Sequence, residues 1–119
     1  MVYYYKLSVT TLRNYLDLIE STDFSKIAKD IAQILFHDRN WVRDDVDYPE
    51  AVETAELMAF GLSPDWRVDE GRIDGERWVT DECLRRIMDG CNRGDSDIIS
   101  IITTIINHAP YPDAEFQDY

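Results

Sequence analysis

The sequence predicts a mainly α-helical fold, a compact single domain of five helices. Apolar residues recur every three or four positions in five segments, and capping or helix-ending residues flank those segments. With 119 residues, 45% of them hydrophobic, the chain is long enough to enclose one core. We therefore predict one domain over residues 1–119, in which residues 110–119 form an extended tail. The alternative is an α+β fold, with a short N-terminal strand and a small hairpin near residues 67–79.

The first third of the chain predicts a short strand followed by two helices. Residues 2–7 are rich in β-prone side chains, which favour the strand. A cap at Ser8 or Thr10 starts the first helix, and a cap at Thr22 or Asp23 starts the second. The apolar positions of the two helices follow helical spacing; they are Leu12, Tyr15, Leu16, Ile19, Phe24, Ile27, Ala28, Ile31, Ile34 and Leu35.

Residues 49–60 predict a third helix, because Pro49 suits the first helical turn and Gly61 suits a C-terminal stop. Its core side consists of Val52, Ala55, Ala59 and Leu62. The outer side carries a slanting acidic row and two apolar side chains, namely Glu50, Glu53, Glu56, Leu57 and Phe60. We expect this outer side to face solvent.

The segment from residue 67 to residue 79 has two interpretations. Its Asp74-Gly75 pair suits a two-residue hairpin turn between Arg72-Ile73 and the residues from Glu76 onward. An irregular acidic loop fits the same residues equally well, and the sequence leaves both open.

Two further helices complete the chain. Thr80 caps the fourth, which contains Cys83 and ends at Gly90, and Asp95 or Ser96 begins the last. In the last helix the apolar side is Ile98, Ile101, Ile102 and Ile105, and the opposite side is Ser100, Thr103, Thr104 and Asn107. Because a strand would alternate and this segment does not, we predict a helix despite its β-branched content.

The charge of the chain is concentrated in its middle. The net charge is −12, and residues 38–82 contribute −9 of it, with five Lys or Arg against 14 Asp or Glu. A protein that binds the nucleic-acid backbone directly needs the opposite sign, because its affinity comes from Lys and Arg that displace counterions. Binding to an anionic membrane is disfavoured for the same reason. No signal peptide is visible and only two cysteines occur, so we expect a cytoplasmic, reducing setting.

Catalytic and metal motifs are weak. The His37-Asp38 pair resembles part of the metal site of HD-type phosphohydrolases, but no histidine precedes it in the chain. The acidic segment that starts at Asp45 holds Glu50 where a calcium loop needs a glycine at position six, and Pro49 stiffens the turn, although Glu56 falls at the terminal acid position. Cys83 and Cys91 are expected to be buried thiols. We therefore predict no catalytic residues, no metal and no cofactor.

These patterns indicate a domain that binds another protein through acidic side chains near the third helix, with Trp41, Trp66 or Trp78 close by. The candidate partner-binding residues are Asp44, Asp45, Asp47, Glu50, Glu53, Glu56, Leu57, Phe60, Asp69, Glu70, Asp74 and Glu76. Contiguous negative charge can occupy a groove that evolved for phosphates, while apolar anchors hold the complex.

The expected function is an inhibitor or nucleic-acid mimic that occupies a basic surface of a nucleic-acid-handling protein. Phage anti-restriction and anti-CRISPR proteins are similar in physical type. One alternative is a bacterial immunity or antitoxin protein that neutralises a toxin, and a lesser one is a small metal-dependent enzyme. The 16 Asp against eight Glu and nine Arg against three Lys also fit solubility or adaptation to salt as the origin of the acidity.

Overall fold

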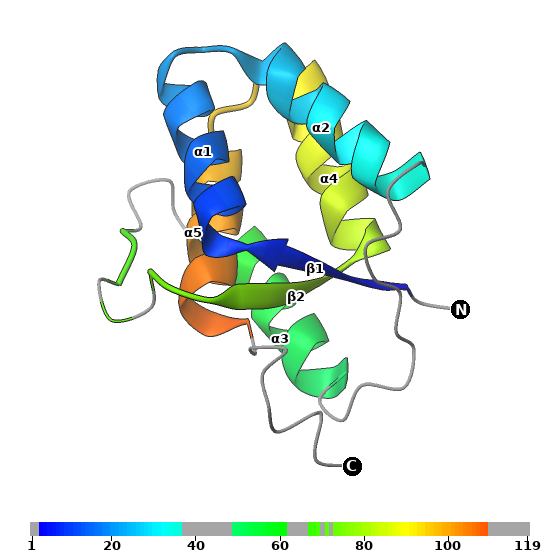
Figure 1. Cartoon of the computed structure of the whole chain (residues 1–119), viewed down its shortest axis with the longest axis vertical. Helices are drawn as coiled ribbons and strands as arrows, with labels where there is room; N and C mark the ends of the chain where they lie inside the picture. Colours follow the sequence, from blue (N-terminus) through cyan, green and yellow to red (C-terminus); the bar gives the residue numbers. More distant parts are fainter. Residues whose placement is uncertain (1–2, 37–48, 62–66, 70, 72, 110–119) are drawn as a thin grey trace.

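Two short strands and five helices make up the described part of this computed structural model, which covers residues 3–36, 49–61, 67–69, 71 and 73–109. In chain order they are β1 (Tyr4–Ser8), α1 (Val9–Glu20), α2 (Phe24–Phe36), α3 (Pro49–Phe60), β2 (Glu76–Thr80), α4 (Asp81–Asn92) and α5 (Ile98–His108) (Figure 1). The mainly α fold with five helices and a short N-terminal strand is therefore confirmed.

The two strands pair with each other, although about 70 residues separate them in the chain. The pairing is antiparallel, with Tyr4 opposite Thr80 at one end and Ser8 opposite Glu76 at the other. The hairpin interpretation of residues 67–79 placed the strand correctly after Gly75 but gave it the wrong partner. Residues 73–75 form a bend, and β2 takes up the hydrogen-bonding groups of β1 instead. Short strands need such a neighbour to satisfy their backbone.

Each strand runs directly into a helix through a capping side chain. The Ser8 hydroxyl accepts a hydrogen bond from the backbone N–H of Thr11 at 3.1 Å, at the start of α1. The Thr80 hydroxyl accepts one from the N–H of Cys83, also at 3.1 Å, at the start of α4. Both caps were among the sequence predictions, and they hold α1 and α4 at opposite ends of the strand pair.

Helix α5 is buried on both of its sides. It packs against α1, α3 and α4, and Ile98, Ile102 and Ile105 are buried as predicted. The opposite side is buried as well, because α3 covers one flank of the helix and β2 contacts it; that side consists of Ser100, Thr103, Thr104 and Asn107. Asn107 satisfies its amide by bonding the backbone of Arg67 and Asp69, whereas the buried Thr104 hydroxyl has no hydrogen-bond partner among the described residues.

Helix α4 does not stop at Gly90, as the sequence predicted, but continues to Asn92. The glycine serves packing instead. A Cβ at Gly90 would lie 2.4 Å from the Cγ2 atom of Ile98, so only glycine lets α5 approach α4 this closely.

Among the described residues, none of the helices has the length and apolarity needed to cross a bilayer. The predicted tail, residues 110–119, lies outside the described part of the chain.

Candidate functional site

A groove of about 220 Å³ lies between α3 and the first half of α4. Buried residues form its floor, chiefly Glu56, Thr80 and Cys83, whereas exposed residues such as Glu53 and Glu82 form its rim. The groove exists because α3 rests on α5 and β2, and α4 rests on α2, α5 and β2. The two helices therefore flank a channel that side chains line.

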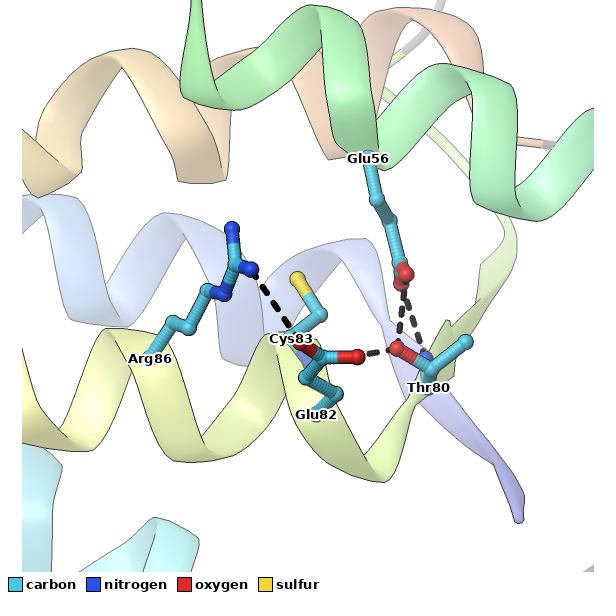
Figure 2. A network of polar contacts seen from close by, with 5 residues as sticks. All are labelled: Glu56, Thr80, Glu82, Cys83 and Arg86. Atoms are coloured by element: carbon cyan, nitrogen blue, oxygen red, sulfur yellow. Dashed lines mark hydrogen bonds and ion pairs between the residues drawn. The ribbon is translucent and has the colours of Figure 1, made fainter. Parts of the chain in front are cut away.

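The carboxylate of Glu56 occupies the floor of the groove. Only 6% of this residue is exposed. Its two oxygens accept hydrogen bonds from the backbone N–H of Thr80 at 2.8 Å and from the Thr80 hydroxyl at 2.6 Å. Figure 2 shows the side chain pointing from α3 toward the start of α4. Glu56 thus fastens α3 to the N-terminus of α4, where the helix dipole favours a negative group.

Burial dominates the electrostatics of this floor. Loss of water raises the pKa of Glu56 above its ordinary value, and the hydrogen bonds from Thr80 oppose that rise only in part. Burial, followed by the neighbouring Glu56 carboxylate, also holds the pKa of the Cys83 thiol well above its usual range. Cys83 is therefore kept as a thiol, which is a poor nucleophile. The prediction that Cys83 and Cys91 are buried is confirmed.

A guanidinium group already lies across the groove. Arg86 of α4 sits over the ring of Phe60 of α3, with its central carbon 4.5 Å from the ring centroid. The same guanidinium donates to the carboxylate of Glu82 at 3.1 Å (Figure 2). A second hollow of about 350 Å³, toward the C-terminal half of α4, is also lined by Phe60 and Arg86. This pair therefore lines both hollows.

The rim of the groove combines exposed carboxylates with exposed apolar side chains. Glu53 is exposed and accepts a 3.2 Å hydrogen bond from the hydroxyl of Tyr4. Burial and the Glu53 carboxylate raise the pKa of Tyr4 to about 12, so its hydroxyl stays a donor. Leu57 is 71% exposed and the adjacent Met58 47% exposed. Leu57 therefore offers an apolar contact beside the acids.

The structure corrects the predicted acidic row on α3. Glu50 and Glu53 are exposed, but the expectation that Glu56 faces solvent is wrong. The helical spacing was right, and the error arose because β2 packs under α3 and covers the third position of the row. Trp78, one of three tryptophans of which at least one was expected close to these acids, is buried in a small cluster with Tyr4 and with Val52 of α3.

The remaining candidate acids are not gathered on α3. Asp74 and Glu76 are exposed at the end of the strand pair where Ser8 lies opposite Glu76. Thr80, which bonds Glu56 of α3, lies at the opposite end. Four residue steps along a strand separate the two ends by about 13 Å. The backbone N–H of Asp69 is bound by Asn107 near the end of α5. The other predicted positions lie outside the described residues; they are Asp44, Asp45, Asp47, Glu70, Trp41 and Trp66.

Sequence reasoning missed the contribution of α4 to the site. Asp81, Glu82 and Arg86 line the groove beside α3, yet none was a candidate residue. One signal was present, because Asp81 and Glu82 directly follow the predicted cap Thr80 and so occupy the first turn of a helix. Their proximity to Glu53 depends on the packing of α3 against β2 and α5, which no local pattern reveals.

Within the described ranges, no three His, Cys, Asp or Glu side chains are grouped as metal ligands. Comparison with known protein families, with curated proteins and with solved structures gives no significant match.

Proposed function

We propose that this chain is an acidic protein-binding domain that inhibits a nucleic-acid-handling protein by occupying its basic surface. The observation that carries the proposal is the groove between α3 and α4, in which acids outnumber the one guanidinium of Arg86. Its accessible acids are Glu53, Asp81 and Glu82, and the buried Glu56 lies beneath them. The net charge of the chain, −12, has the same sign.

The composition of the rim supports a protein partner. A small ion would gain nothing from Leu57, which is 71% exposed beside the acids. A protein surface gains from both, because charge accelerates encounter and an apolar anchor that loses its water supplies affinity. Surfaces that bind nucleic acid are rich in Lys and Arg, and they provide the complementary charge.

A matched pair of double variants tests which acids make the binding surface. Glu50→Lys with Glu53→Lys reverses two exposed acids on α3, and Asp74→Lys with Glu76→Lys reverses two exposed acids at the far end of the strand pair. Both changes alter the net charge by the same amount. Each protein is immobilised and challenged with purified nucleases, restriction enzymes, CRISPR effectors and transcription factors at low and high salt.

We expect at least one panel member to bind the unmodified chain, to bind less at high salt, and to lose its own nucleic-acid binding in competition. The α3 double variant should weaken that binding by about tenfold or more, and the control variant by much less. Equal weakening by the two variants, or no binding by any panel member, would contradict the proposal.

A second candidate is an immunity or antitoxin protein whose target does not bind nucleic acid. The exposure of Leu57 and Met58 favours it, because such a complex would depend more on apolar anchors than on net charge. Binding that survives high salt but is lost in Leu57→Ala would support this candidate over the first.

A further inference from the structure

The Arg86 guanidinium shows what kind of group the channel between α3 and α4 can hold. Its planar face lies on the Phe60 ring, and its edge donates to Glu82. An aromatic face together with a carboxylate suits arginine better than lysine, because guanidinium stacks and donates in a fixed plane whereas ammonium is a compact, strongly hydrated charge.

The acids of the groove outnumber this one resident cation. Arg86 pairs with Glu82, and Thr80 holds the buried carboxylate of Glu56. Glu53 and Asp81 line the same groove from α3 and from the first turn of α4. Within the described residues no ion pair involves either of them. Asp81 and Glu82 lie in the first turn of α4, where their negative charge offsets the positive end of the helix dipole that would otherwise oppose an incoming cation.

The resident arginine is held loosely. Its side chain is 50% exposed, and its ion-pair partner Glu82 is 74% exposed, so the pair is screened by water. An exposed pair of this kind contributes little stability. The Arg86 side chain beside Phe60 therefore costs little to displace from Glu82.

We propose that the α3–α4 groove is a binding site for an arginine side chain of a basic protein partner, and that Arg86 is its resident competitor. This inference rests on the proposed function for the identity of the partner, but the recognition of arginine can be tested without that partner. An incoming guanidinium takes the face of Phe60 and the carboxylates of Glu82 and Glu53, while Arg86 swings out toward solvent.

The test uses four-glycine pentapeptides with one central arginine, lysine or citrulline, titrated into the full chain and followed by NMR chemical shifts. Citrulline keeps the shape of arginine but has no charge. We expect the apparent affinity to decrease from arginine to lysine to citrulline, with the largest shifts at Phe60 and Glu82. Equal binding of arginine and citrulline, or stronger binding of lysine, would overturn the proposal.

A pair of variants tests the role of the resident arginine. Arg86→Met removes the competitor and should strengthen binding of the arginine peptide by about two- to fivefold, the usual range for one freed cation–π site. Arg85→Met makes the same charge change on the other side of α4, where Arg85 lies over Phe36 of α2, and should alter binding less. Unchanged or weaker binding in Arg86→Met would show that Arg86 does not compete for the site.

The two proposals fail separately. If no nucleic-acid-handling protein binds the chain but the peptide series follows the expected order, the arginine site stands and the proposed function falls. If a partner binds through α3 but the peptides do not distinguish arginine from citrulline, the proposed function stands and the arginine site falls.

Discussion

The two ends of β2 attach helices to the strand pair with opposite charges. At one end, the backbone N–H and the hydroxyl of Thr80 donate hydrogen bonds to the buried carboxylate of Glu56. Thr80 is the cap of α4, so this carboxylate lies at the N-terminus of that helix. Near the other end Arg77, with 0% exposure, donates at 2.8 Å to the carbonyl of Ile106 in the last turns of α5. The acid meets the positive end of one helix and the base meets the negative end of another.

This comparison distinguishes buried charged groups that hold the fold together from exposed ones that can contact a partner. Burying an ionised group is costly unless hydrogen bonds replace its water, and both groups have several. Arg77 also donates to the carbonyls of Asp74 and Glu76 at 3.0 Å each. Glu56 and Arg77 are therefore committed to the fold, whereas the exposed acids of α3 and α4 remain free to meet a partner.

The largest effect is expected from Arg77→Met. The variant keeps much of the buried stem but leaves three backbone carbonyls without their donor, so the free energy of unfolding should fall by about 3–5 kcal/mol. Chemical denaturation measures it. Arg85→Met is the control and should change the same quantity by less than about 1 kcal/mol, since Arg85 lies at the surface and loses only its contact with the exposed Phe36 ring. If the free energy of unfolding falls by less than about 1 kcal/mol in Arg77→Met, Arg77 does not hold the strand pair to α5.

Thr80→Val tests the acidic end. The variant loses both the hydroxyl that caps the helix at the Cys83 N–H and its hydrogen bond to Glu56, so the free energy of unfolding should fall by about 2–3 kcal/mol. Thr80→Ser retains the hydroxyl and should lose no more than about 1 kcal/mol, because only a methyl group is removed. If the serine variant is as unstable as the valine variant, the hydroxyl is not what holds α3 to α4.

The smallest effect is a pH dependence that belongs to Glu56. Burial raises its pKa above the ordinary 4.5, so the folded chain binds this proton more tightly than the unfolded chain does. The group therefore contributes stability below pH 4.5, and that contribution is lost as the pH rises through the raised pKa.

Glu56→Gln removes this dependence. The unfolding free energy of the unmodified chain minus that of the variant should decrease between about pH 4 and about pH 7. Glu50→Gln, which removes an exposed acid of the same helix, corrects for the loss of one charge. A difference that increases with pH would mean that the Thr80 hydrogen bonds outweigh burial.

Local patterns predicted most of the helices. Residues 49–60 and the caps Ser8 and Thr80 were found from sequence, because capping and helix-ending residues act within a few positions. Gly90 was taken as a stop because glycine often ends helices, but here its missing side chain makes room for Ile98.

Long-range packing decided what the sequence could not. The burial of Glu56 and Arg77 depends on β2 lying beneath α3 and against α5, and a charged side chain on a helix or strand is normally exposed. The groove was missed for the same reason, since Glu53 and Glu82 come together only when α3 packs against β2 and α5.

Hydrogen exchange tests the central claim, that the available acids lie on α3 and the start of α4, most directly. Amide exchange of the chain is compared with and without a partner found in the panel. We expect new protection in α3 and in the first two turns of α4, and unchanged exchange around Asp74 and Glu76. Protection confined to the Asp74 end, or to α2, would contradict the account.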